Sequence, residues 1–223
     1  MTKTFAMVVS LALIVTVAVS PVWAVGDKVR GEKASGPAGD DGGGAPITNR
    51  GTTVGPNDQS LDVLTDAEIE DITYIRQEEK LARDVYLTLY NHYVEIDPIF
   101  AQIFGNISES EQRHMDAVKR LIDKYGLEDP VMDDAVGVFP EPETVLDANF
   151  NELFGNLVEQ GKISYCEALK VGIFIEETDI ADIEVALNNV TARDVSRVFN
   201  NLLSGSYNHW NAFNSRYETN NCE

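Results

Sequence analysis

The sequence predicts an all-α protein built from four long helices. From residue 61 onward, apolar residues recur at alternating steps of three and four, which is the spacing of one helix face. Helix-capping patterns precede the apolar runs, and segments containing glycine or proline separate them. No segment shows the sustained alternation of polar and apolar residues that is typical of a half-buried strand.

Composition and charge restrict the classes of protein and partner. The chain has 223 residues, with 37 Asp and Glu against 17 Lys and Arg, and a formal net charge of −20. Nucleic acids and anionic membrane surfaces are also negative, so neither is expected as a main partner. Two cysteines are too few for a disulfide-dense scaffold or a structural zinc site built mainly from thiolates. The length suits one ordinary globular domain with appendages.

The first 24 residues differ from the rest. Residues 5–19 are almost wholly apolar, and residues 22–24 fit the small-x-small rule of a signal-peptidase site. We therefore predict a secretory signal peptide over residues 1–24 and an exported protein, periplasmic or extracellular, with no stable membrane insertion after cleavage. The alternative is an uncleaved N-terminal anchor, for which the apolar run is short.

A flexible linker is predicted over residues 25–60. This segment holds 9 of the 16 glycines and three prolines, and it has no periodic apolar pattern. Such a composition cannot bury enough surface to offset the loss of chain entropy on folding. The folded domain is therefore expected over residues 61–223.

The first two long helices are predicted from capping boxes. Thr65 and Glu68 begin an amphipathic run that ends near Tyr93. Residues 98–104 are expected to form a short helical turn. A second capping box, residues 108–111, predicts a helix that ends near Tyr125, with Gly126 as its C-cap.

The second half of the domain is predicted to hold one short and two long helices. The short helix extends from about residue 149 to 160, and the long helices cover about 164–187 and 191–213. The connection between the second and third long helices, residues 126–163, is far longer than an antiparallel hairpin needs. We therefore expect a four-helix bundle with a long crossover between helices two and three, a class that includes the ferritin-like folds.

Polar residues that can bind metals interrupt the apolar face of each long helix. A buried carboxylate costs several kcal/mol unless it is paired, protonated or bound to a metal. Because such groups occur on four helices, a cation held between the helices is the simplest shared partner. The mixture of carboxylates and imidazoles suits iron or manganese better than copper(I). The predicted metal ligands are Glu79, Glu111, His114, Glu176, Asp179 and His209.

Several of these residues have other interpretations. Glu78 could replace Glu79 after a slight rotation of its helix, and Glu177 could likewise replace Glu176. Glu111 could instead cap its helix by accepting from the amide of Ser108.

The remaining candidates also have structural alternatives. Asp179 could be solvated, and His209 could hydrogen-bond to Ser206. His92 lies at a helix end and is expected at the surface. Tyr86 is expected in the core, with contact to a metal ligand as the minority interpretation.

Four stretches of the sequence resemble the ferritin-like family labelled domain of unknown function 2202. They are residues 77–86, 108–114, 175–180 and 205–209, and the resemblance covers roughly residues 61–214. The family is related to the rubrerythrins, whose first helix carries a ligand Glu followed by Ala three and Tyr seven residues later. Glu79, Ala82 and Tyr86 match that spacing. The resemblance implies a four-helix bundle and a di-iron site.

One position departs from the rubrerythrin pattern. Those sites carry Glu-x-x-His on the fourth helix, whereas Ser206 occupies the Glu position three residues before His209 here. The expected site therefore lacks a bridging carboxylate, which Asp179 could replace. A single metal, a differently bridged pair and a vestigial site without metal all stay open.

The two cysteines predict a disulfide. Cys166 lies at the start of the third long helix and Cys222 just beyond the end of the fourth. If these helices are antiparallel, the two ends are neighbours, and an exported protein favours the oxidised form.

Two classes of function are compatible with these patterns. The first is a metal-dependent oxidoreductase that binds iron and reacts with a small oxidant such as dioxygen or peroxide, oxidising iron or removing peroxide. The second is a non-catalytic helical bundle that binds a partner or belongs to the cell envelope, with a vestigial metal site. A homo-oligomer is compatible with either.

Overall fold

The computed structural model describes residues 63–144 and 147–222, in which the chain forms five α-helices and no strands. The all-α prediction is therefore confirmed for these ranges. None of the helices within them is both long and apolar enough to cross a membrane. The predicted signal peptide, residues 1–24, and the predicted linker, residues 25–60, lie outside the described residues.

Helix α1 spans Asp66–Tyr93 and begins at the predicted capping box. The amide of Glu68 donates to Thr65 Oγ1 at 3.2 Å, and the amide of Thr65 donates to Glu68 Oε2 at 2.8 Å. Glu68 Oε1 also accepts from the amides of Thr191 and Ala192, at 2.6 and 2.8 Å. This one carboxylate therefore joins the start of α1 to the start of the last helix.

Helix α2 spans Pro98–Tyr125, so the prediction of a separate helix beginning at Ser108 is wrong. The helix begins instead at Asp97, whose side chain accepts from the amides of Ile99 and Phe100. An Asp N-cap followed by Pro is a strong start signal, and the short turn expected over 98–104 is simply its first part. Ser108 lies inside the helix and donates its hydroxyl to the Gly105 carbonyl at 2.8 Å.

The end of α2 and the later helices agree more closely with the predictions. Gly126 adopts the left-handed conformation, with φ of 66°, and caps α2. Helix α3 spans Phe150–Gly161, and α4 spans Tyr165–Leu187. Helix α5 spans Arg193–Thr219, so it extends beyond the predicted end near residue 213.

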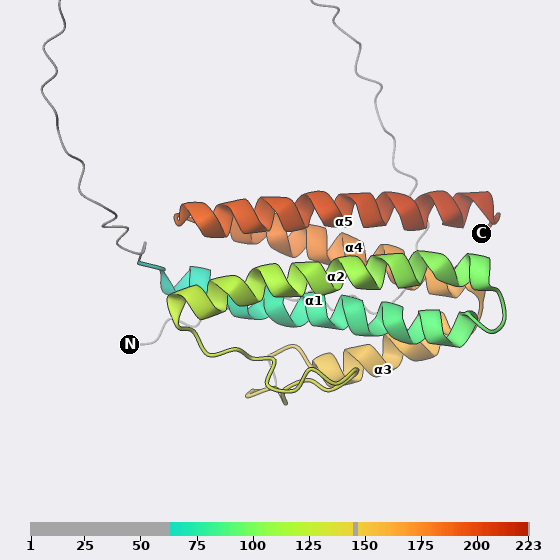
Figure 1. Ribbon diagram of the computed structural model, residues 1–223, viewed down its shortest axis with the longest axis horizontal. Coiled ribbons are helices and arrows are strands. Elements are labelled where there is room, and N and C mark those ends of the chain that lie inside the picture. The colour runs from blue at the N-terminus through green and yellow to red at the C-terminus, as the bar shows by residue number, and fades with distance from the viewer. Residues whose placement is uncertain (1–62, 145–146, 223) are drawn as a thin grey trace, which may run out of the picture. The chain divides into compact units, whose positions relative to one another are not determined.

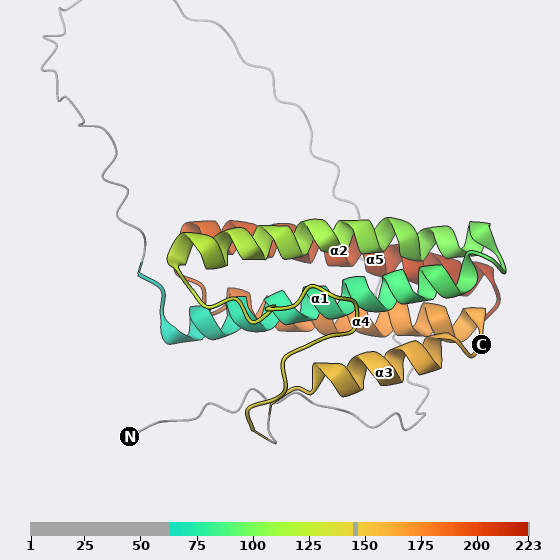
Figure 2. The ribbon, with the colours of Figure 1, turned by 60° about the horizontal axis from the view of Figure 1, so that its bottom comes forward.

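The four long helices α1, α2, α4 and α5 lie side by side (Figure 1). Helix α1 packs against α2 and α4, and α5 packs against α4 and α2. Helix α3 lies outside this group against α1 and α4 (Figure 2). The connection from α2 to α4, which includes α3, leads from one end of the long helices to the other.

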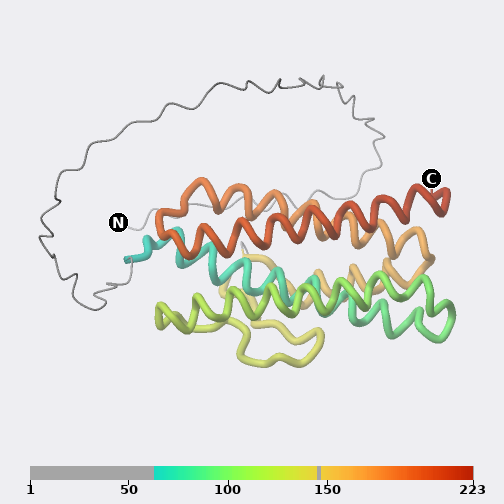
Figure 3. The backbone as a smooth tube through the Cα atoms, turned by 45° about the horizontal axis from the view of Figure 1, so that its top comes forward, coloured from blue at the N-terminus to red at the C-terminus, as the bar shows by residue number. Residues whose placement is uncertain are grey.

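The apolar core is divided into two clusters along the long helices. On α1, one cluster includes Ile72 and Ile75 and the other begins at Leu81. The same division occurs on α2, α4 and α5, and the pairing of α4 with α5 and of α1 with α2 can be followed in Figure 3. Buried carboxylate, hydroxyl and imidazole groups occupy the segment between the clusters on each helix. The fold therefore gathers polar groups into one layer with apolar packing on both sides.

Ion pairs and hydrogen bonds of buried charged residues on α1 hold the segment between α2 and α3. Lys80 is fully buried, and its Nζ donates to Asp84 Oδ2 at 2.5 Å and to the Ala135 carbonyl at 2.7 Å. Asp84 Oδ2 also accepts from the Gly137 amide at 2.9 Å. Arg83 donates to Asp134 Oδ1 at 2.8 Å. These contacts hold the long connection against the outer side of α1.

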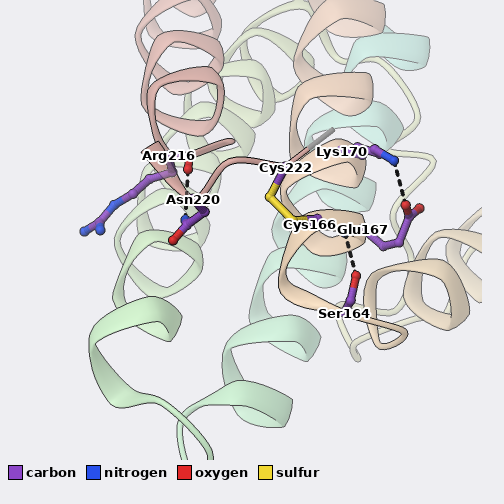
Figure 4. Close-up of a disulfide and its surroundings, with 7 residues drawn as sticks. All are labelled: Ser164, Cys166, Glu167, Lys170, Arg216, Asn220 and Cys222. Carbon is purple, nitrogen blue, oxygen red and sulfur yellow. Dashed lines mark hydrogen bonds and ion pairs between the residues drawn. A yellow bond between two sulfur atoms is a disulfide. The ribbon is translucent and has the colours of Figure 1, made fainter. Parts of the chain in front are cut away.

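A disulfide joins Cys166 near the start of α4 to Cys222 just after α5 (Figure 4), as predicted. The two Cα atoms lie 5.4 Å apart, which is an ordinary spacing for a disulfide. The bond attaches the C-terminal end of the described chain to the beginning of α4.

Candidate metal centre

Six predicted ligands lie in the polar layer, each on the helix from which it was expected. Two groups of metal-binding side chains form there: Glu79 with Glu111 and His114, and Glu111 with Glu176 and His209. In each group the ligand atoms all lie within 4.8 Å of one another. Asp179, the sixth predicted ligand, belongs to neither group. Four helices thus bring together carboxylates and imidazoles that are far apart in the sequence.

Glu111 is common to both groups. Its Oε2 atom lies 2.8 Å from His114 Nδ1, and its Oε1 atom lies 2.7 Å from His209 Nδ1. On the outer sides, Glu79 Oε2 lies 3.2 Å from His114 Nδ1, and Glu176 Oε2 lies 3.5 Å from His209 Nδ1. The arrangement is therefore a carboxylate and an imidazole on each side of one shared carboxylate.

Several buried atoms in this layer lack a hydrogen-bond partner among the described residues. They include Glu79 Oε1, Glu111 Oε1 and His209 Nδ1. The last two are 2.7 Å apart, yet they are not aligned as a hydrogen bond. Buried polar atoms are nearly always paired, and a cation would satisfy these lone pairs together. The residues present therefore fit a metal ion.

Burial and mutual repulsion raise the pKa values of the two outer carboxyls. Burial raises the pKa of Glu79 to about 8, against the opposing attraction of His114. Burial and the nearby charge of Glu111 raise the pKa of Glu176 to about 8. Each outer carboxyl accordingly keeps its proton near neutral pH unless another positive charge replaces it.

The shared carboxylate and the two imidazoles behave in the opposite way. Burial opposes ionisation of Glu111, but the adjacent imidazoles of His114 and His209 outweigh it and lower its pKa to about 2. Burial also disfavours the imidazolium ions, yet the adjacent carboxylates raise the pKa of His114 to about 11 and that of His209 to about 10. Without a cation, Glu79, Glu176 and the two imidazoles therefore hold protons near neutral pH, whereas Glu111 is ionised.

Tyr86 touches the candidate ligand Glu176. Its hydroxyl donates to Glu176 Oε1 at 2.6 Å, and its ring is fully buried. The other oxygen of Glu176 faces His209. The expectation that Tyr86 lies in the core is confirmed, and its hydrogen bond fixes the orientation of the Glu176 carboxylate.

Asp179 accepts a hydrogen bond from Ser206, the residue at the position where the sequence departs from the rubrerythrin pattern. Ser206 Oγ donates to Asp179 Oδ2 at 2.5 Å, while Asp179 Oδ1 has no hydrogen-bond partner within the described ranges. Burial raises the pKa of Asp179 well above its usual value, and the charges of Glu79 and Glu111 add to this. Asp179 thus lies beside the two groups, with one oxygen tied to α5 and the other free.

The positions of the side chains distinguish the predicted ligands from the neighbouring residues that could have replaced them. Glu79, not Glu78, contacts His114. Glu177 is exposed and accepts from Trp210 Nε1 at 3.0 Å. His92 is partly exposed.

Capping does not explain Glu111. The residue lies within α2 rather than at its start, and its carboxylate faces two imidazoles. Its orientation is therefore set by tertiary contacts.

Gly205 was not predicted as part of the site. A Cβ atom at this position of α5 would lie 2.5 Å from both Cε1 and Nε2 of the His114 ring. Glycine therefore leaves the space in which the imidazole reaches Glu79 and Glu111. The sequence signal was weak, because a glycine inside a helix has many explanations.

Comparisons with known proteins identify the family of this chain. A relative from Methanocaldococcus jannaschii, the uncharacterized protein MJ0754, is 49% identical over 150 residues, which cover 67% of this chain and 75% of that protein. A crystal structure of hypothetical protein MJ0754 from Methanococcus jannaschii aligns with a TM-score of 0.64 and 46% identity, covering 71% of this chain and 84% of that one. Residues 68–223 match an uncharacterized protein domain, DUF2202. The chain therefore belongs to the DUF2202 family.

Proposed function

We propose that this chain is a ferritin-like four-helix-bundle protein that binds two iron ions in its polar layer and uses them to oxidise iron or to reduce peroxide. The observation that supports this most strongly is Glu111, whose two oxygens face two different imidazoles. A carboxylate in this position can bridge two cations, each of which also has its own carboxylate and imidazole.

The residues divide between the two ions as follows. Glu79 and His114 would hold one ion, and Glu176 and His209 the other, with Glu111 shared. Glu111 would supply the bridge that Ser206 cannot. Three protein ligands for each ion leave open coordination positions, as catalytic metal sites require.

The ligand types favour iron or manganese. Carboxylate oxygens are hard ligands and imidazole nitrogens are borderline, which together suit these metals. When bound, iron would supply the one-electron redox chemistry needed to reduce dioxygen or peroxide. The outer carboxyls of Glu79 and Glu176 would release their protons as the ions bind, because metal ligands must be deprotonated.

The surrounding residues would control access and orientation. The apolar clusters on both sides keep the layer dry, and a low local dielectric strengthens attraction between ligands and cations. Tyr86 holds one oxygen of Glu176 through its hydrogen bond, leaving the other toward His209. These contacts would preorganise the site without a large rearrangement on binding.

Metal binding is tested by loading the chelator-treated protein with Fe²⁺ or Mn²⁺ under argon. We expect about two equivalents in the wild type, as for paired-metal bundle sites. Glu111→Gln should lose most of both ions, whereas Glu177→Gln, which alters an exposed carboxylate, serves as the matched control. Less than about a tenth of an equivalent in the wild type under all loading conditions would overturn the proposal.

Turnover requires a separate test. The Fe²⁺-loaded protein is mixed with dioxygen or with hydrogen peroxide, and the appearance of ferric absorbance is followed by stopped flow. A faster reaction with one oxidant identifies the preferred substrate. Rates no greater than those of free Fe²⁺ in buffer would remove the redox activity while leaving metal binding intact.

The second candidate is a non-catalytic helical bundle that binds a partner or belongs to the cell envelope. The hydrogen bond between Ser206 and Asp179 favours it, because the position expected to supply a ligand is already satisfied within the protein. Under this function, Glu79→Ala and His114→Ala change thermal stability but no redox property. Metal-dependent increases in melting temperature would favour the metal centre instead.

Export is proposed from residues 1–24, and the disulfide supports it. Disulfides persist mainly in oxidising compartments, and Cys166 and Cys222 are bonded. The N-terminus of protein purified from its native host decides the point. A mature chain that begins near residue 25 supports cleavage, whereas an intact Met1 in a cytoplasmic fraction contradicts it.

A further inference from the structure

A second set of acidic side chains lies between α1 and α4, next to the metal groups but outside them. We call Asp71, Glu78, Asp179 and Asp182 the acidic row. Asp71 and Glu78 are two turns apart on α1, and Asp179 and Asp182 are three residues apart on α4, so each pair shares one helix face. Helices α1 and α4 pack together. Glu78 is close enough to both Asp182 and Asp179 for their charges to raise its pKa, and Asp71 is likewise affected by Asp182.

Three of the four members of the acidic row are buried. Asp71 is 8% exposed, Glu78 7% and Asp179 8%. Each has one buried carboxyl oxygen with no hydrogen-bond partner in the described part of the chain. Within the same ranges, no Lys or Arg forms an ion pair with any member of the acidic row. Such burial costs stability, so a role other than stability is needed to explain it.

The two ions of the proposed centre do not explain the whole row. Their ligands are Glu79, Glu111 and Glu176 with two imidazoles, and neither Glu78 nor Asp182 belongs to the groups that converge. Among the described residues, no three carboxyls of the acidic row converge as the two metal groups do. The arrangement therefore differs from a closed site that would retain a third ion.

Asp182 is the most exposed member of the acidic row, and the proposed ligand Glu79 is more buried than any member. Asp182 is partly exposed, Glu78 and Asp179 are buried, and Glu79 at the inner end is only 1% exposed. Asp179 is also close enough to Glu79 for the two charges to repel. The row thus connects the surface between α1 and α4 with a ligand of the proposed centre.

We propose that Asp182, Glu78 and Asp179 form an entry path by which divalent cations pass from the surface to Glu79. This inference rests on the proposed metal centre and adds its route of loading. Single carboxyls hold a divalent ion weakly, so an ion can move from one to the next instead of remaining. Negative charge at the entrance of such a path also raises the local cation concentration and the association rate.

The path is tested by the rate of Co²⁺ uptake, followed by visible absorbance in a stopped-flow instrument. The test variant is Glu78→Gln with Asp182→Asn, which removes two carboxyls and nearly preserves shape. The matched control is Glu109→Gln with Asp116→Asn, which removes the same number of carboxyls from exposed positions of α2. We expect association to slow by about tenfold or more in the test variant, while the control stays near the wild-type rate.

Equilibrium measurements separate a path from a binding site. A route affects entry and exit alike, so the test variant should keep the wild-type number of bound Co²⁺ ions and a similar Kd. Fewer bound ions would show that the row holds a resting metal, and uptake as fast as in the control would show that ions enter elsewhere. Either result overturns the path.

Failure of the proposed centre gives a different result. In that case the wild type binds no Co²⁺ in this assay, whereas failure of the path leaves wild-type binding intact. If the double variant does not fold, Co²⁺ uptake is measured with the Asp182→Asn single variant instead. Asp182 is partly exposed, so its replacement is easier to accommodate. A slower uptake at unchanged stoichiometry supports the path, and an unchanged rate overturns it.

Discussion

Gly205 of α5 faces the His114 imidazole of α2 so closely that a Cβ atom would lie 2.5 Å from two ring atoms. This contact places the ring where its Nδ1 atom lies 2.8 Å from Glu111 and 3.2 Å from Glu79. A backbone position on one helix therefore determines the geometry of candidate ligands on two others.

Gly205→Ala should displace the His114 ring and weaken one of the two proposed ion sites. We expect bound metal to fall from about two equivalents toward one, because the atoms nearest to an added Cβ all belong to His114 and not to Glu176 or His209. Metal content after loading and dialysis measures the change. Gly155→Ala is the control, since a Cβ at that helical position meets nothing within 4 Å. Equal metal content in the two variants would contradict a positioning role for Gly205.

The metal-free protein should lose stability as the pH rises. In the folded state Glu79 and Glu176 keep protons up to about pH 8, whereas their usual pKa is 4.5. His114 and His209 keep theirs to about pH 11 and 10, against a usual value of 6.5. The folded state thus binds more protons than the unfolded state between about pH 4.5 and 10, so the free energy of unfolding falls across that window.

Urea unfolding of chelator-treated protein at pH 5, 7 and 8.5 measures this dependence. The metal-loaded protein should show the opposite trend over the same range, because deprotonated ligands bind metal more tightly. A free energy of unfolding that does not change with pH in the metal-free protein would show that these groups are not shifted as described.

Reduction of the Cys166–Cys222 disulfide should destabilise the domain. The bond closes a loop with a sequence separation of 56 residues. The chain-entropy relation gives a stabilisation of about 4 kcal/mol for a loop of that length. Urea unfolding with and without reductant measures the effect, and the Cys166→Ser, Cys222→Ser double variant should be unaffected by reductant. A difference below about 1 kcal/mol would show that the reduced chain compensates.

Lys80→Met should cost far more stability than removal of an exposed lysine. Lys80 and Asp84 are fully buried, and loss of one partner of such a pair typically costs about 3–5 kcal/mol. Lys119 pairs with Asp123 at the surface, where an ion pair contributes about 1 kcal/mol or less. The Lys80→Met and Lys119→Met variants are compared by urea unfolding. Similar losses in both would mean that Asp84 remains satisfied by Arg83 and by the connection between α2 and α3.

Local signals in the sequence were sufficient where a helix end is determined by neighbouring residues. Thr65, Ser164 and Gly126 act within one helical turn, and the structure places helix ends at all three. The start of α2 was missed because Ser108 also fits a capping pattern. Asp97 followed by Pro98 begins the helix earlier, and the intrahelical hydrogen bonds then continue through residue 108.

The sequence by itself determined that carboxylates and imidazoles interrupt the inner faces of four helices, because helical periodicity assigns residues to faces. Only the tertiary structure decided that Glu111 stands between His114 and His209, that Gly205 makes room for one ring, and that Lys80 and Asp84 fasten the long connection. The reason is physical. Periodicity specifies the direction of a side chain about its own axis, whereas distances between helices depend on how the helices pack and slide against one another.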